Sequence, residues 1–164
     1  MVNGAPYNGE SWANSYSIEK YVNWKNAPYS WETRSDQDYI VFRYAQVLLM
    51  YAEAKNEAMG PDQSVYDAVN MVRARPTVNM PPLPAGLDQA GMRARIRNER
   101  IVELGMEGLR YWDIKRWKIA ETVIPTVVDP SGISRVFIPG KHYLFPFSQS
   151  EMDRNPNLTQ NPGY

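Results

Sequence analysis

The chain contains no cysteine and a single histidine, His142, among its 164 residues. Without cysteine, neither a disulfide framework nor a thiol nucleophile is available. A structural zinc site takes about four nitrogen or sulfur ligands, which one histidine cannot supply. A serine triad would have to use His142, and the sequence has neither a Gly-x-Ser-x-Gly motif nor a P-loop. We therefore expect no catalytic residue, no metal and no cofactor.

The sequence also lacks a long apolar run and an excess of charge of one sign. No apolar run reaches the roughly 18 residues of a membrane span, and residues 1–6 lack the basic head and apolar core of a signal peptide. Lysine plus arginine equals aspartate plus glutamate, 18 of each, which gives no reason to expect nucleic acid as a partner. The basic stretch 93–118 is interleaved with acidic residues, which indicates a paired face.

What the sequence does contain is helical periodicity, interrupted by proline and glycine. Four helices are predicted, and they span residues 44–59, 64–75, 89–104 and 109–123. Apolar side chains of the first helix recur at helical spacing and form one stripe, made of Tyr44, Val47, Leu48 and Tyr51. We expect a helical core over residues 44–124, with two antiparallel helix pairs resembling tetratricopeptide units. Because three such units are usually needed to seal a stack, an apolar face should stay exposed.

Both ends of the chain are predicted to be irregular. Residues 1–38 combine turn-forming residues with many aromatic rings, which either cover a neighbouring domain or line a ligand surface. Residues 134–164 are expected to form a small β-hairpin, turning at Pro139-Gly140-Lys141, and a docked tail. The predicted fold class is therefore mainly α, with paired antiparallel helices, long irregular loops and a β-hairpin near the C-terminus.

The stretch 98–117 places acidic and basic residues at helical spacing. Glu99, Glu103 and Glu107 recur every four positions, where like charges repel slightly, so cations must approach from another segment. Arg110 and Arg116 are the expected partners. We interpret the stretch as a structural ion-pair clamp between two helices, and a ligand site is the alternative. The clamp consists of Glu99, Arg100, Glu103, Glu107, Arg110, Asp113 and Arg116.

Two of these carboxylates on one helix could also meet the spacing of about 5–10 Å that glycosidases use. Glu99 with Glu103, or Glu103 with Glu107, would provide such a pair. Nearby arginines lower the pKa of a carboxyl group, which suits an ion pair better than a general acid. The structural interpretation is therefore favoured over a glycan-cleaving enzyme.

Sugar binding uses aromatic rings that stack on a pyranose, together with polar groups that bond its hydroxyls. The N-terminal segment has such parts, and the candidates for glycan binding are Trp12, Trp24, Tyr29, Trp31 and Arg34. The alternative is that these rings pack against a neighbouring domain. Trp112 and Trp117 are weaker candidates, because both lie within the charged stretch.

Three stretches resemble the C-terminal part of the SusD/RagB family and follow one another in the expected order. They read RYAQVLLMYAEA (43–54), NERIVELGMEGLRYWDIKRW (98–117) and FPFSQSEMDRNPNLTQNPGY (145–164). The resemblance covers about residues 16–164. Family members are longer and carry a signal peptide and a lipid-bearing cysteine. We therefore expect residues 1–164 to be a single C-terminal domain of such a protein, with its lipid anchor outside this chain.

The resemblance implies a surface-exposed lipoprotein of the outer membrane in Bacteroidetes-type bacteria. It would bind glycans or other nutrients without catalysis and cap a SusC-like TonB-dependent transporter. Glycan contacts in the family come largely from the N-terminal half, so no binding residue is carried over onto this chain. The alternative function is a helical-repeat module for protein–protein interaction, without a small-molecule ligand.

Overall fold

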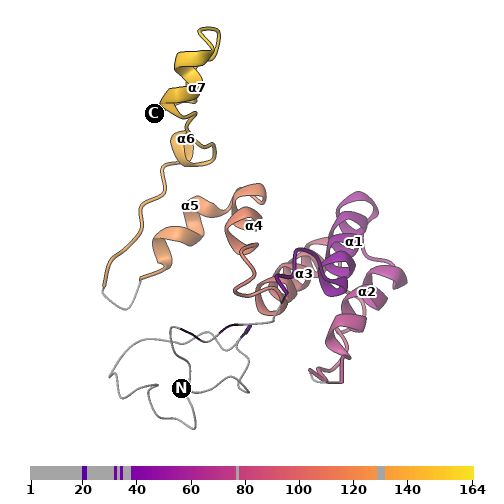
Figure 1. The fold of residues 1–164 in the computed structure, drawn as a ribbon. Helices are drawn as coiled ribbons and strands as arrows, with labels where there is room; N and C mark the ends of the chain where they lie inside the picture. Colours follow the sequence, from indigo (N-terminus) through magenta and orange to yellow (C-terminus); the bar gives the residue numbers. More distant parts are fainter. Residues whose placement is uncertain (1–19, 22–31, 33, 35–37, 77, 129–131) are drawn as a thin grey trace. The chain divides into compact units, whose positions relative to one another are not determined.

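The structure is a computed structural model of the chain, and it describes residues 20–21, 32, 34, 38–76, 78–128 and 132–164. The regular elements in these ranges are helices, so the predicted mainly α fold class is confirmed (Figure 1). The chain divides into two compact units, which we name the helical unit (Ile18–Arg110) and the terminal unit (Met1–Ser17 with Tyr111–Tyr164). No helix of the described ranges is long and apolar enough to cross a membrane.

The described part of the helical unit contains α1 (Tyr44–Met59), α2 (Gln63–Arg73) and α3 (Gln89–Glu103). α1 packs against both α2 and α3, so it is the central helix of this unit (Figure 1). The three predicted helices are confirmed, and their ends differ from the expected positions only by the one or two residues usual at helix boundaries. The tetratricopeptide-like pairing stays a prediction.

Local sequence signals explain where these helices begin and end. The Asp62 carboxylate accepts a hydrogen bond from the Val65 amide at 3.2 Å, and Asp88 accepts one from the Gly91 amide at 2.7 Å. Both contacts satisfy amide groups that have no partner within the first turn of a helix. Gly60, directly after α1, has a φ of +82°, a left-handed conformation in which a side chain would be strained.

The core of the helical unit consists of aliphatic side chains from all three helices. The fully buried ones are Leu49, Ala52, Val65, Val69, Val72, Met92 and Ile96. The buried face of α1 differs from the predicted stripe, because Tyr44, Val47 and Tyr51 are 67%, 49% and 47% exposed. α1 is covered by two helices, and its small alanines allow them to approach closely, whereas bulky rings would hold them apart.

One polar side chain lies within this core. Asn56 is fully buried, and its Nδ2 donates to the Gln89 carbonyl at 3.1 Å. The Gln89 Nε2 donates in return to the Asn56 carbonyl at 2.7 Å. This reciprocal pair joins the last turn of α1 to the first residue of α3, and it offsets part of the cost of burying the amide, whose Oδ1 has no hydrogen-bond partner among the described residues.

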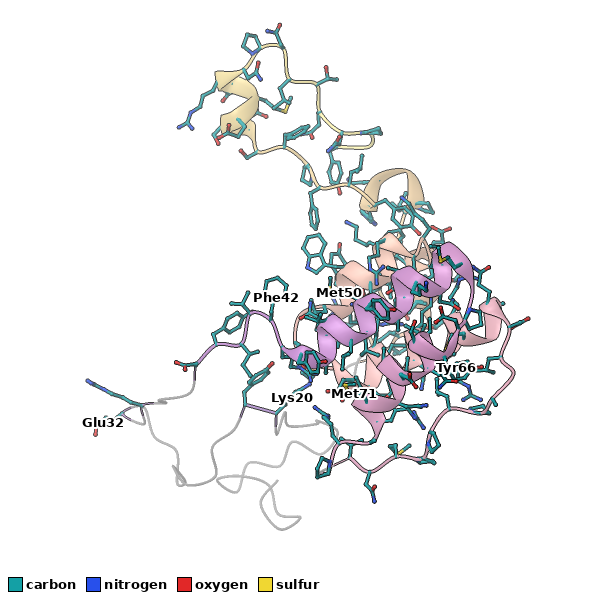
Figure 2. All side chains as sticks on the ribbon, turned by 90° about the vertical axis from the view of Figure 1, so that its right-hand side faces the viewer. Lys20, Glu32, Phe42, Met50, Tyr66 and Met71 are labelled. Atoms are coloured by element: carbon teal, nitrogen blue, oxygen red, sulfur yellow. The ribbon has the colours of Figure 1, made fainter. Side chains whose placement is uncertain are left out.

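The outer face of α1 and the segment before it are apolar. Phe42 and Met50 lie on the outside of the helical unit, where they are 72% and 48% exposed (Figure 2). Together with the exposed rings of Tyr44 and Tyr51, they agree with the expectation that so few helices leave apolar side chains uncovered.

The terminal unit contains short helices. They are α4 (Arg110–Arg116), α5 (Ala120–Val123), η3 (Ile124–Thr126), α6 (Pro139–His142) and α7 (Gln149–Arg154). The first residue of α4, Arg110, is the last residue of the helical unit.

The single helix predicted over 109–123 is therefore corrected to two. Lys118 interrupts it with a left-handed φ of +54°. The Ile119 amide bonds the Ile114 carbonyl at 3.0 Å and the Lys118 amide bonds the Lys115 carbonyl at 3.1 Å, which is a Schellman end with lysine where glycine is usual.

The predicted β-hairpin is also corrected. Residues 139–142 form α6 instead of a hairpin turn, and 135–138 and 143–147 are not strands. Proline suits the first position of a helix as well as a turn, and here Pro139 takes the helical position. The Ile138 amide donates to His142 Nδ1 at 2.9 Å, so the histidine side chain satisfies an amide group at the start of α6.

The chain end is held against the segment that precedes α7. Gln160 bonds both the amide and the carbonyl of Phe147, at 2.9 and 3.0 Å. Asn161 donates to the Phe145 carbonyl at 2.7 Å, and the Tyr164 hydroxyl donates to the Leu144 carbonyl at 3.1 Å. These side-chain hydrogen bonds join residues 144–147 to residues 160–164.

The burial of α1 leads to a direct test of its orientation. Leu49→Ala should lower the free energy of unfolding by about 2–5 kcal/mol, because it leaves a cavity in the core. Val47→Ala, on the same helix but half exposed, should change it by less than about 0.5 kcal/mol. Urea denaturation followed by circular dichroism measures both. A larger loss for Val47→Ala would mean that the predicted stripe faces the core after all.

Candidate functional site

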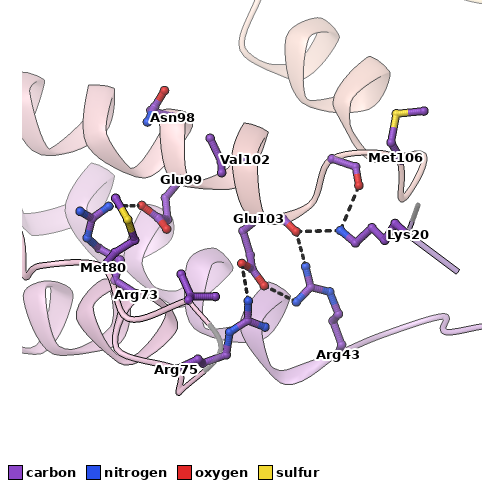
Figure 3. Close-up of a pocket in the computed structure, with 12 residues that line it drawn as sticks. Lys20, Arg43, Arg73, Arg75, Met80, Asn98, Glu99, Val102, Glu103 and Met106 are labelled. Carbon is purple, nitrogen blue, oxygen red and sulfur yellow. Dashed lines mark hydrogen bonds and ion pairs between the residues drawn. The ribbon is translucent and has the colours of Figure 1, made fainter. Parts of the chain in front are cut away.

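The helical unit has a pocket with a volume of about 640 Å³, within the usual size of small-molecule sites (Figure 3). Its lining combines charged and apolar side chains. The lining residues are Lys20, Arg43, Arg73, Arg75, Val78, Met80, Asn98, Glu99, Val102, Glu103, Gly105 and Met106.

Helix ends position the charged groups of the pocket. Arg43 precedes α1 with an extended backbone, and Arg73 is the last residue of α2. Arg75 follows two residues later, before Pro76. Because Glu99 and Glu103 are four residues apart, their carboxylates lie on one face of α3, where these arginines meet them (Figure 3).

Glu103 is the centre of this ion-pair network. Its carboxylate accepts hydrogen bonds from Arg43 Nη1 and, at 2.8 Å, from Arg75 Nη2. Its backbone carbonyl accepts from Arg43 Nη2 at 2.5 Å and from Lys20 Nζ at 2.9 Å. The Glu103 side chain is only 8% exposed, so these contacts are protected from water and from salt.

Glu107 continues the network beyond α3. Arg43 donates from Nε to both of its carboxylate oxygens, at 3.0 and 2.8 Å, and Lys20 forms a further ion pair. Burial by itself would raise the pKa of Glu107, but the hydrogen bonds from Arg43 and Lys20 outweigh it, so the pKa lies below its usual value. Burial of Arg43 would lower its pKa, but the hydrogen bonds to Glu107 and Glu103 outweigh this effect, so the pKa of Arg43 is raised.

Glu99 has a separate partner. Arg73 Nη1 donates to its carboxylate at 2.6 Å, while Arg73 Nε donates to the Pro81 carbonyl at 2.8 Å. This contact ties the end of α2 to the segment that follows it and to α3.

The cations that contact Glu99 and Glu103 therefore differ from the expected Arg110 and Arg116. Arg116 instead pairs with Asp113 inside α4, at 2.9 Å. Arg100, which is buried, lies 3.7 Å from Glu53 and links α3 to α1. Glu99, Glu103, Glu107 and Asp113 all take part in ion pairs, and the role of the seven residues as one clamp stays a prediction.

Sequence reasoning missed Arg43, Arg73 and Arg75 as members of the site. Arg43 lies within a stretch that resembles the family, but no spacing relates it to an acid 60 residues away. The pair of arginines at the end of α2 precedes Pro76 and is typical of a helix C-terminus, which does not predict a ligand or an ion-pair partner.

The terminal unit carries a cluster of aromatic rings around a lysine. Trp112 and Phe145 lie with their ring centroids 5.6 Å apart, and Tyr111 lies 5.8 Å from Trp112. Lys115 Nζ is 4.0 Å from the centroid of Phe145, and this buried ammonium group has no hydrogen-bond partner in the described residues. The three rings remain 41–55% exposed. We name Tyr111, Trp112, Lys115 and Phe145 the aromatic cluster.

Four of the five predicted glycan-binding residues, Trp12, Trp24, Tyr29 and Trp31, lie outside the described residues. Arg34 is described and exposed. In the described ranges, no group of three acidic, histidine or cysteine residues is arranged to hold a metal ion.

A model of the SusD family matches residues 3–164. The chain belongs to the SusD family. SusD-like protein P2 of Formosa agariphila is 36% identical over 154 residues, which cover 90% of this chain and 30% of that protein. SusD-like protein P25 of the same organism is 35% identical over 130 residues, covering 76% of this chain and 24% of the other.

Solved structures of SusD proteins share the fold. A SusD homolog from Bacteroides thetaiotaomicron is 37% identical with a TM-score of 0.64, and the match covers 76% of this chain and 26% of that one. A SusD superfamily protein from Parabacteroides distasonis is 32% identical with a TM-score of 0.61, and the match covers 80% and 28%. This SusD-family chain therefore spans less than a third of the length of each of these relatives.

The network makes Arg43 more important for stability than an arginine of an exposed ion pair. Arg43→Gln should lower the free energy of unfolding by about 3 kcal/mol, because it leaves two poorly exposed carboxylates with fewer partners. The matched control is Arg93→Gln, which breaks the exposed 2.5 Å pair with Glu57 and should cost about 0–1 kcal/mol. Equal midpoints of urea denaturation for the two variants would contradict this assignment.

The lowered pKa of Glu107 predicts a pH dependence. Because its pKa is lower in the folded chain than the usual value of about 4.3, its ion pairs stabilise the fold above that pH, and the stabilisation is lost as the pH falls through the folded-state pKa. The free energy of unfolding should therefore differ between wild type and Glu107→Gln at pH 7, and the difference should shrink below about pH 4.

Urea titrations from pH 7 to pH 3 measure this difference. The control is Glu151→Gln, whose carboxylate is 61% exposed and whose i,i+3 pair with Arg154 should contribute little at any pH. A Glu107→Gln difference that stays constant across the range would show that Glu107 does not titrate as its surroundings require.

Proposed function

We propose that this chain is part of a protein that binds glycans or other nutrients at the surface of the outer membrane, without catalysing a reaction. The bound nutrient passes to a SusC-like TonB-dependent transporter for import. The observation that supports this proposal is membership of the SusD family, with a match that extends over residues 3–164.

The state of the carboxylates supports a binding function over a glycosidase. A general acid needs a carboxyl group whose pKa is raised toward neutral pH. Glu107 has a lowered pKa, and Glu99 and Glu103 both accept hydrogen bonds from arginines. The contacts of Glu107 with Arg43 and Lys20 favour its charged form, which suits an ion pair.

Within the described residues, the aromatic cluster is the surface best suited to stack against a sugar ring. Trp112 and Phe145 are 55% and 51% exposed, so a pyranose can reach them. Sequence reasoning ranked Trp112 low because of the charges around it. The structure instead has Trp112 beside two other rings, at centroid distances of 5.6 and 5.8 Å. The N-terminal tryptophans remain further candidates.

One observation favours the alternative of a protein-interaction module. The outer face of α1 exposes Tyr44, Val47 and Tyr51, which no helix of the described residues covers. Apolar side chains of this kind mark protein contacts more often than sugar contacts. Under this alternative the chain binds another protein segment and no small molecule.

The proposal is tested by calorimetric titration of the purified chain against a panel of neutral and charged oligosaccharides. At least one should bind, and Trp112→Ala should weaken that binding by about fivefold, the effect of one lost stacking contact. Met59→Ala, an exposed apolar side chain of α1, is the matched control and should have no effect. Failure of every oligosaccharide to bind would favour the interaction module, and release of reducing ends would contradict a non-catalytic role.

A further inference from the structure

We propose that the pocket of the helical unit binds a small organic anion, and that a sugar carrying a carboxylate is the class of ligand its walls fit. This inference rests on the proposed nutrient-binding function and assigns one ligand class to a site separate from the aromatic cluster. Three features of the pocket support this assignment: an excess of cationic groups, an arginine with an unused donor, and apolar side chains in the lining (Figure 3).

The first feature is the balance of charge. Four cations line the pocket, Lys20, Arg43, Arg73 and Arg75, against the carboxylates of Glu99 and Glu103. Glu107 adds a third carboxylate through its contacts with Lys20 and Arg43. All three carboxylates already accept hydrogen bonds from these cations. Because the network has four cations and three carboxylates, it carries one positive charge in excess, which attracts an anion into the pocket.

The second feature is Arg75. Its side chain is 40% exposed, compared with 19% for Arg43 and 14% for Arg73, so it is the arginine most open to a ligand. It forms one hydrogen bond, from Nη2 to Glu103. Its Nε is buried, so the donors that a ligand can reach are those of the terminal Nη groups, of which Nη1 forms no hydrogen bond within the described part of the chain. The two terminal nitrogens of a planar guanidinium group match the two oxygens of a carboxylate.

The third feature is the apolar wall. Val78, Met80, Val102 and Met106 line the pocket beside the charged groups. An inorganic anion would gain nothing from them, whereas a pyranose has an apolar face as well as a polar edge. The flexible side chains of the two methionines can adapt to such a face. The volume of about 640 Å³ accommodates a ligand of this size.

The test compares a trimer of galacturonic acid with its methyl ester, which keeps the ring and removes the charge. Calorimetric titration of the full chain should show the acid binding about tenfold more tightly than the ester at low salt. The preference should decrease at 0.5 M salt, because part of the attraction is screened. Arg75→Gln should abolish the preference, and Arg93→Gln, which lies in an exposed ion pair with Glu57, should retain it.

A second variant keeps the test decisive if Arg75→Gln weakens the fold through its loss of the Glu103 contact. Met80→Ala removes part of the apolar wall and no ion pair, and it should weaken the binding of acid and ester alike by a few-fold. Equal affinity for acid and ester would overturn this inference and leave the proposed function standing. So would binding of neutral oligosaccharides only, or an acid preference that survives in Arg75→Gln. Failure of every sugar to bind would overturn both.

Discussion

The arrangement of the helical unit depends on the interactions of Glu103. Its carboxylate binds an arginine before α1 and another beyond α2, while its own position is at the end of α3. Burial of aliphatic side chains stabilises these helices but has no direction. The hydrogen bonds to Glu103 fix where the helix ends lie. A buried ion pair of this kind adds little net stability, yet removal of one partner is costly, because the other charge is left without compensation.

The same network that positions the helices also forms the wall of the pocket. All three side-chain nitrogens of Arg43 donate hydrogen bonds to Glu103 or Glu107. Arg75 donates one hydrogen bond, from Nη2 to Glu103. Arg43 therefore has a structural role, whereas Arg75 is the arginine to which we assign the proposed binding role.

Much of the fold could be predicted from the sequence because it is encoded locally. Apolar periodicity, Asp88 and Gly60-Pro61 act within a few residues, and α1, α2 and α3 lie where these signals put them. The orientation of α1 could not be predicted, since its face is chosen by two partner helices. At Pro139 and Lys118 the local sequence signal itself is ambiguous. Proline begins turns and helices alike, and lysine rarely takes the left-handed conformation that ends α4. For the site, the spacing of the acids was visible, but their arginines are remote in sequence and meet them only through packing.

The reciprocal amide pair of Asn56 and Gln89 has a consequence for the alignment of the core. Apolar contacts have no direction, so by themselves they would allow α1 and α3 to shift past each other by one turn, about 5.4 Å. Such a shift would separate each side-chain amide from the backbone carbonyl that it bonds, and the fully buried Asn56 would lose its contact in an apolar interior. The pair therefore selects one axial alignment of the two helices. Because each side chain bonds a backbone carbonyl, a substitution at either position removes one of the two hydrogen bonds and leaves the other in place.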